Sequence, residues 1–342
     1  MSAADPRPAA DSMNAPAAEV VRQLASRERL RWYEAGVWLL AIGFYFVGQS
    51  YLSLWSQILV MILFALSLDL VVGYAGLVTL GHGAFFGLGA YTAGILAARG
   101  HTEALSGLAA AAVVAGLAGL LSGAVILRTK GLTFVMLTLA LLMLLHEVAN
   151  RAVGLTGGAD GLSGITLSPL FGQFRFDIYG KTAYLYSLGV LFVGWCIVRA
   201  VVYSPFGRSI VGIRENARRM PAIGAPVHRR LVLLYCLSAA LAGVAGALLA
   251  QTTQSVALTM IDLERSGMIL VMLILGGVGR LYGAFFGVPV FVLAQDALSK
   301  QDPTYWLFWL GVTLIAVVLF GRGGILGIGD RLALAWQRRR SR

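Results

Sequence analysis

A few polar and ionisable side chains stand within long apolar runs, and they are the first candidates for chemistry. Asp69 lies in the apolar run 54–72, where an isolated charge costs about 2.5 to 3.5 kcal/mol on insertion scales. We therefore expect it to face a partner or a cavity. Because it lies near the end of the run, it can instead be protonated or reach the membrane–water interface. Tyr74, Thr79 and His82 follow closely. With Asp69 they are the candidate residues for a translocation path.

Metal and catalytic chemistry is not expected. His146 and Glu147 resemble the start of the helical zinc-protease motif, which needs a second His four residues after the first. Position 150 is Asn, so the motif is incomplete and no metal site is predicted. The chain also shows no convergent set of catalytic residues, so we do not expect an enzyme.

A phosphate-binding loop, GxxxxGK[ST], is also missing. Gly180, Lys181 and Thr182 end like that loop, but Arg175 occupies the place of its first glycine. We therefore expect no cofactor, ATP included, on this chain. If it transports a solute, the energy has to come from a partner.

The longest strongly polar insert between apolar runs is 204–230. Ser204 followed by Pro205 predicts a helix start, because the hydroxyl can cap free amides and proline has no amide to lose. Pro221 is expected to end the helix. Its apolar residues share one face, namely Phe206, Ile210, Ile213, Ala217 and Met220. Two interpretations are open: a docking helix for another protein, or a loop lying on lipid headgroups.

Composition predicts an all-α polytopic membrane protein. Charged residues make up 13% of the chain and hydrophobic residues 58%, far from the balance of a soluble domain. Apolar runs long enough to cross a bilayer predict about ten transmembrane helices, at 35–51, 54–72, 77–98, 105–127, 131–148, 183–203, 231–251, 265–279, 282–299 and 304–320.

Lys and Arg define an orientation for these spans. With both termini cytoplasmic, 21 of the 27 fall on the inner side, and six fall outside: Arg99, Arg151, Arg175, Lys181, Arg265 and Lys300. Such a bias is the orientation signal of membrane proteins. It explains the net charge of +11 without nucleic acid, and leaves the membrane lipid as the expected surroundings.

The same reading divides the chain into segments. Residues 1–34 are expected to be a partly disordered cytoplasmic tail without a cleavable signal peptide, and 35–320 the transmembrane domain. Within it, 204–230 is a cytoplasmic loop and 149–182 an extracytoplasmic loop. Residues 321–342 are a basic cytoplasmic tail.

Two glycine-rich segments each leave two interpretations. Residues 73–98 favour either close helix packing or a broken helix near a translocation path. In the outer loop, the core 156–164 is either turn chemistry or a contact surface for an external protein. The candidate contact residues are Thr156, Gly157, Gly158, Asp160 and Gly161.

Five motifs in order resemble one family. They are GYAGLVTLGHGAFFGLGAYTAG (73–94), TGGADGLSGI (156–165), PFGRSIVGIREN (205–216), SAALAGVAGALLA (238–250) and LGGVGRLYGAFFG (275–287). Together they resemble the LivM-type permease of branched-chain amino acid ABC importers, over roughly 55–328.

The resemblance implies a ten-helix permease in the bacterial cytoplasmic (inner) membrane. It implies four kinds of contact: a second homologous permease, two cytoplasmic ATP-binding subunits that hold ATP and Mg, an extracytoplasmic substrate-binding protein, and the membrane lipid. The family's coupling segment falls on Pro205, Phe206, Gly207, Arg208, Ile213, Arg214, Glu215 and Asn216.

Three residues depart from the family's pattern. Ala217 stands where an acidic residue usually follows the coupling motif, Asp69 where Asn is frequent, and Gly321 where Pro is frequent. The expected cargo is a branched-chain amino acid or a similar small polar solute. Urea, short amides and a pentose-type sugar are the alternative cargoes. The alternative functions outside transport are an integral membrane enzyme and a scaffold.

Overall fold

The computed structural model describes residues 32–47, 51–165, 168 and 181–301, with isolated residues 305, 308, 309, 311, 312, 324 and 327. The chain divides into two compact units, Met1–Val47 and Gly48–Arg342. The expected tails, most of the span 304–320 and much of the outer loop lie outside the described residues. The first unit is represented by one helix, α2 (Trp32–Val47).

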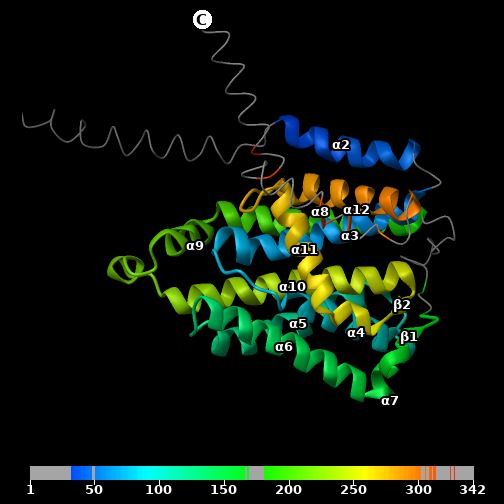
Figure 1. Ribbon diagram of the computed structural model, residues 1–342, viewed down its shortest axis with the longest axis horizontal. Coiled ribbons are helices and arrows are strands. Elements are labelled where there is room, and N and C mark those ends of the chain that lie inside the picture. Colours follow the sequence, from blue (N-terminus) through cyan, green and yellow to red (C-terminus); the bar gives the residue numbers. More distant parts are fainter. Residues whose placement is uncertain are drawn as a thin grey trace, which may run out of the picture. The chain divides into compact units, whose positions relative to one another are not determined.

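The described part of the second unit is helical almost throughout (Figure 1). Its α-helices are α3 (Leu52–Asp69), α4 (His82–Ala98), α5 (Ala104–Ile126), α6 (Leu132–Arg151), α7 (Val153–Thr156), α8 (Lys181–Tyr203), α9 (Pro205–Asn216), α10 (Val227–Thr253), α11 (Leu263–Gly276) and α12 (Gly283–Gln301). A π-helical turn, η2 (Leu70–Tyr74), continues α3. These bounds follow the predicted spans closely.

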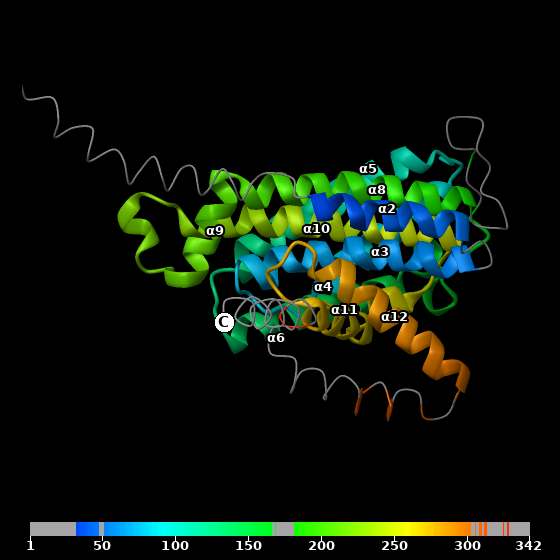
Figure 2. The same cartoon turned by 90° about the horizontal axis from the view of Figure 1, so that it is seen from above.

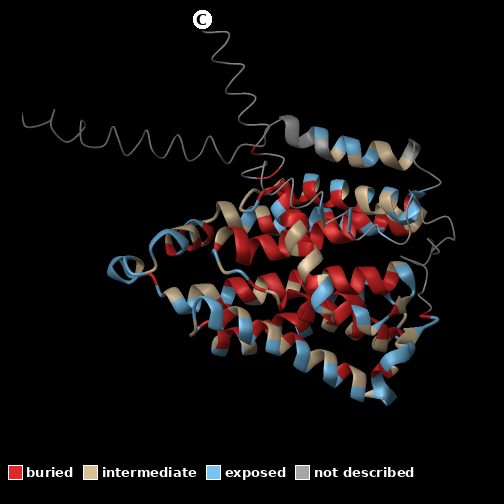
Figure 3. Cartoon of the chain, viewed as in Figure 1, coloured by how far each residue is buried: buried red, intermediate tan, exposed pale blue. Residues whose placement is uncertain are grey.

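Within the described part of the second unit, α3, α4 and α10 have more buried residues than any other helix (Figure 3). In α3 with η2, 94% of the most apolar stretch is buried, against 22% in α6. The outer helices expose large apolar side chains instead, including Leu121, Val125 and Leu132. An apolar outer surface on long helices fits lipid rather than water.

Small residues bring the inner helices together. A Cβ at Gly243 of α10 would meet Ala115 and the carbonyl oxygen of Ala111 on α5, and one at Gly246 would overlap the carbonyl oxygen of Phe86 on α4. Such close approach of backbones is the usual way of packing helices in membranes. The glycine-rich segment thus packs closely, as one of its two interpretations required.

The other interpretation of that segment is met in part: the helix is broken, whereas its place near a translocation path stays a prediction. Helix α4 begins at His82 and not near 77, because the preceding residues form a non-helical passage after η2. Gly76 has a φ of 72°, which suits glycine, and Gly81 N–H donates to Thr79 Oγ1 at 3.1 Å. The predicted span is therefore interrupted at its start.

The two ends of the long helices differ (Figures 1 and 2). At one end α9 and the turn after it project beyond the bundle. At the other end β1 (Leu162–Ser163) pairs antiparallel with β2 (Ser255–Val256), followed by the 3-10 turn η5 (Leu258–Ile261). The expected coupling loop and the expected outer loop thus lie at opposite ends of α8.

Five helical segments of the described chain are long and apolar enough to cross a membrane: Leu52–Tyr74, Ala104–Ile126, Leu132–Arg151, Lys181–Tyr203 and Val227–Thr253. Helices α4, α11 and α12 also occupy predicted spans, but they are shorter or more polar. A multi-pass membrane fold follows, and the number ten stays a prediction.

Candidate functional site

The start of α9 is built as its sequence predicts. Ser204 Oγ accepts from Gly207 N–H at 3.1 Å, and Pro205 occupies the first turn. A Cβ at Gly207 would overlap the carbonyl oxygens of Val201 and Val202. Glycine therefore allows α9 to leave α8 at a tight corner, which fixes the two helices to one another.

The end of α9 differs from the prediction. The helix ends at Asn216, so the expectation that Pro221 ends it was wrong. Asn216 Oδ1 accepts from the backbone N–H groups of Arg218 and Arg219, both at 3.2 Å. This side-chain bonding turns the chain early, and Pro221 falls in a separate 3-10 turn (Met220–Ile223).

The faces of α9 are separated as expected. Ile210 and Ile213 are buried, and Phe206 is half-buried. The exposed residues of α9 away from the bundle are Pro205, Arg208, Glu215 and Asn216. Arg214 is also exposed, but it follows Ile210 by four residues and so lies on the side of the bundle. An inner apolar face and an exposed charged face suit a helix that joins the bundle to another protein.

Arg214 connects α9 to the core of the bundle. Its guanidinium donates to the backbone carbonyl oxygen of Gly73 in η2. Asp69, which is buried, accepts from the backbone N–H of Gly279 at 2.7 Å and interacts electrostatically with Arg214. We call Asp69, Gly73, Arg214 and Gly279 the Arg214 junction.

Glycines make the Arg214 junction compact. A Cβ at Gly73 would overlap both the Asp69 carboxylate and the backbone of Gly279, and one at Gly76 would lie 2.8 Å from Arg214 Cγ. Gly279 itself has a φ of 75°. The junction thus joins α9, η2 and the α11–α12 loop in one contact, and a side chain at these glycines would separate them.

Of the other candidate path residues, Tyr74 lies next to the junction, because it follows Gly73 in η2 and interacts electrostatically with Asp69. His82 is buried between α3 and α10, where its Nε2 is 3.0 Å from Ser67 Oγ and 3.4 Å from Ser238 Oγ. Its ring stacks on Phe64, with centroids 5.7 Å apart. Thr79 is buried and Tyr74 half-buried. The structure therefore brings Asp69 to Arg214, and places His82 in the helix core; a role in a path stays a prediction for all four.

The candidate outer contact residues divide into buried and exposed ones. Thr156 and Gly158 are buried, and Thr156 Oγ1 donates to the Ala149 carbonyl oxygen at 2.5 Å. Gly157 and Gly161 have positive φ, and a Cβ at Gly161 would overlap the Val256 carbonyl oxygen. Asp160 is exposed. Of the five, Asp160 has the side chain that an external protein can reach.

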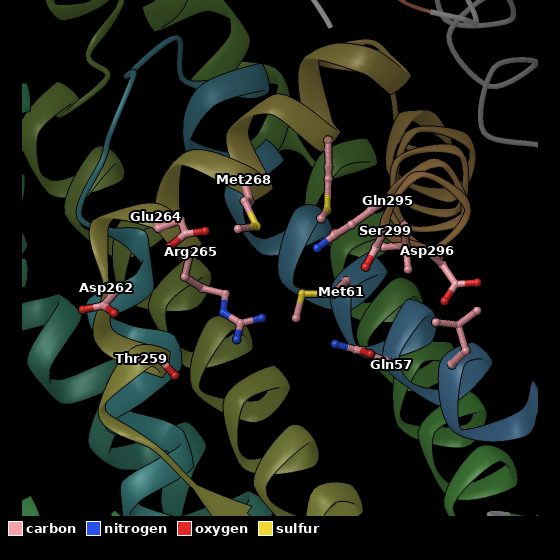
Figure 4. Close-up of a pocket in the computed structure, with 13 residues that line it drawn as sticks. Gln57, Met61, Thr259, Asp262, Glu264, Arg265, Met268, Gln295, Asp296 and Ser299 are labelled. Carbon is pink, nitrogen blue, oxygen red and sulfur yellow. The ribbon is translucent and has the colours of Figure 1, made fainter. Parts of the chain in front are cut away.

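A cavity of about 370 Å³ lies between α3, η5, α11 and α12 (Figure 4). We call it the α11–α12 cavity. Its charged lining residues are Asp262, Glu264, Arg265 and Asp296, and its apolar ones are Leu54, Met61, Met268, Met272 and Val292. This volume falls in the range of small-molecule sites.

Sequence reasoning missed this cavity, although a signal was present. Arg265 was assigned only to the outer side of the membrane. Arg265, Met268 and Met272 are spaced three and four apart, which places them on one face of a helix. A cation that shares its face with flexible apolar residues at the start of a span could have drawn attention to α11.

A mainly helical bundle with an apolar surface and a projecting amphipathic helix indicates a multi-pass membrane protein. The chain belongs to the family described as branched-chain amino acid transport system / permease component, which matches residues 50–318. It is thus a permease component of an ABC transporter. Members of this family are transport components, which agrees with the expectation that the chain is not an enzyme.

Relatives agree on transport and differ in cargo. The chain is 25% identical over 310 residues to the high-affinity branched-chain amino acid transport system permease protein LivM of Escherichia coli, covering 84% of this chain and 73% of the relative. It is 25% identical over 303 residues to LivM of Salmonella typhimurium, covering 82% and 71%. It is also 26% identical over 227 residues to the L-arabinose ABC transporter permease protein AraH of Azospirillum brasilense, covering 62% of each. No solved structure matches the chain.

Proposed function

We propose that this chain is the permease subunit of an ATP-driven importer that moves branched-chain amino acids, or a similar small polar solute, across the bacterial inner membrane. The chain itself has about ten transmembrane helices with both termini in the cytoplasm, and it pairs with a second homologous permease. Two cytoplasmic subunits hold ATP and Mg and dock on α9, and an extracytoplasmic binding protein delivers the solute.

The observation that supports this proposal most is the contact between α9 and the core. A helix that only rested on lipid headgroups would need no polar contact with the spans. Arg214 instead reaches from α9 to Gly73 in η2, and η2 is π-helical. Single π-helical turns are frequent at functional sites.

The mechanism that we propose is alternating access. When ATP draws the two ATPases together, the helix docked on them moves as a lever. Arg214 transmits the movement to η2 and, through Asp69, to the α11–α12 loop. A rigid-body shift of the helices then opens the central path toward the loaded binding protein.

Copurification and uptake test the proposal together. The whole operon is expressed, the chain is isolated through an affinity tag, and the complex is placed in liposomes with the binding protein. We expect ATPase subunits to copurify and labelled L-leucine to enter only with ATP. Isolation of the chain without any ATPase would show that the importer assignment is wrong.

A pentose-type sugar is the second candidate cargo, because the AraH permease matches 62% of the chain. The same liposomes discriminate the two. Uptake of labelled L-arabinose that excess L-leucine does not reduce would favour the sugar and leave the importer architecture intact.

A further inference from the structure

The α11–α12 cavity carries groups that fit both ends of an amino acid. We propose that it is a transit site for a zwitterionic amino acid with an apolar side chain, whose carboxylate is bound by Arg265. The inference rests on the function proposed above and assigns residues of the permease itself to the cargo.

Arg265 is the group that points most clearly to a ligand. It lies in the first turn of α11, and its side chain extends into the cavity (Figure 4). The guanidinium is 6.0 Å from the centre of the Phe86 ring. Among the described residues it forms no ion pair within 4 Å. Glu264 and Asp262 act on Arg265 electrostatically, but among the described residues no carboxylate is in hydrogen-bond contact with the guanidinium, so its donors are open to a ligand.

The chemistry of the guanidinium selects the ligand group. Its planar fork donates two parallel hydrogen bonds to a carboxylate, a geometry that a hydroxyl cannot match. Nearby acids do not neutralise it by direct contact, because Asp262 is engaged with His146 Nε2 at 3.1 Å and Asp296 with Lys300 Nζ at 2.6 Å. Arg265 is therefore available for an anion.

Acceptors for an ammonium group line the same cavity. Glu264 precedes Arg265 and lines the cavity, and no ion pair of the described helices uses its carboxylate. The side-chain amides of Gln57 and Gln295 also line the cavity, and Figure 4 shows them between α3 and α12. Carboxylate and amide oxygens in one cavity with a guanidinium suit the two charges of a zwitterion.

The rest of the lining suits an aliphatic side chain. Met61, Met268 and Met272 contribute flexible thioether chains, and Leu54 and Val292 add branched apolar groups. Methionine adapts to apolar groups of different shape. Among the described lining residues no aromatic ring offers the flat apolar platform on which the C–H face of a sugar packs.

The position of the cavity agrees with entry from the binding-protein side. Thr259 in η5 and Asp262 line the cavity, and η5 follows directly on β2, which pairs with the loop that carries Asp160. The Arg214 junction lies at the other end of α3 and α11. The cavity is thus at the end of the spans from which cargo arrives.

Photo-labelling tests the inference directly. The complete importer in liposomes is irradiated with photo-leucine, a leucine analogue that carries a diazirine in its side chain, and the labelled peptides are identified by mass spectrometry. We expect label on α11 around Met268, reduced by excess L-leucine and not by L-arabinose. Label that is absent from α11, or that L-arabinose removes, would overturn the proposal.

Three variants separate binding from folding. We expect Arg265→Gln to reduce both the label and L-leucine uptake at least tenfold, since a charge-assisted pair is lost. Arg265→Lys keeps the positive charge but loses the planar guanidinium. Its labelling and L-leucine uptake should lie between those of Arg265→Gln and the unmodified protein. Arg99→Gln, an exposed outer arginine, is the matched control and should change neither.

Two further readings keep the outcomes distinct. Copurification of the ATPases with Arg265→Gln shows that this variant folds. If the Arg265→Gln complex does not assemble, Met268→Trp is used instead. It fills the cavity and should reduce L-leucine uptake more than L-alanine uptake. Equal reduction would contradict the inference. Normal L-leucine uptake by Arg265→Gln would overturn the site alone, whereas a failure of the unmodified complex to import any amino acid would overturn the proposed function.

Discussion

Arg214 in α9 donates a hydrogen bond to the backbone carbonyl oxygen of Gly73, 141 residues earlier in the chain. Gly73 lies between Asp69 and the loop of Gly279, so one side chain contacts the point where three segments meet. Under the proposed function, this contact connects α9 with η2 and the α11–α12 loop.

Replacing Arg214 by Ala should uncouple ATP hydrolysis from uptake. Loss of a charge-assisted hydrogen bond of about 1.5 to 3 kcal/mol should reduce solute moved per ATP by at least tenfold, with the complex still assembled. Uptake and ATPase rate are measured in the same liposomes. Arg219→Ala, just beyond α9 and exposed, serves as the control, and equal effects of the two variants would show that the contact is incidental.

Glu215→Lys should also uncouple, for a different reason. Glu215 is exposed on the outer face of α9, so reversing its charge leaves the bundle intact and changes the surface offered to an ATPase. We expect normal expression, weaker ATPase copurification and uptake lowered several-fold. Normal uptake would remove Glu215 from the coupling segment.

Asp69→Asn and Asp69→Ala should behave differently. Asn retains an oxygen that can accept from Gly279 N–H, so assembly should be preserved. Ala leaves that N–H without its acceptor, at a cost of about 1 to 3 kcal/mol, and should lower the melting temperature of the detergent-solubilised protein. If the Asp69→Asn protein assembles but does not transport, the charge itself belongs to the path. If the Asp69→Ala protein has the melting temperature of the parent, the hydrogen bond to Gly279 is dispensable.

Much of the fold was predictable because apolar runs and Lys/Arg placement act locally. The ends of α5, α8 and α10 fall within a few residues of the predicted spans, and the Ser204–Pro205 start of α9 was confirmed. The early end of α9 was missed, because Asn216 bonds to the following backbone through its side chain, which competes with the rule for proline.

The site was harder to predict than the helices. The motifs identified Asp69 and Arg214 separately, but only the packing of α9 on η2 shows that they meet. His82 lies buried beside Phe64 and Ser67, an environment that its sequence position did not reveal. The α11–α12 cavity unites residues from 54 to 299, a combination that no local pattern predicts.

The exposed position of Asp160 makes it the test of the outer loop. Asp160→Lys should weaken stimulation of ATPase activity by the loaded binding protein several-fold without changing the basal rate. Thr156→Ala, which removes the buried hydroxyl that holds the loop, should instead lower stability. If Asp160→Lys leaves this stimulation unchanged, the segment 156–164 is a structural turn and not a contact surface for the binding protein.

Gly246→Ala should disturb the core, whereas Gly189→Ala should not. A Cβ at Gly246 of α10 would overlap the Phe86 carbonyl oxygen of α4, and one at Gly189 of α8 would meet nothing within 4 Å. Overpacking of a close helix contact costs about 1 to 3 kcal/mol, so Gly246→Ala should melt at lower temperature in detergent and yield less assembled complex. Because Ala is a better helix former than Gly, Gly189→Ala should melt at or slightly above the parent temperature. If Gly246→Ala melted at the same temperature as Gly189→Ala, α4 and α10 could move apart without loss of stability.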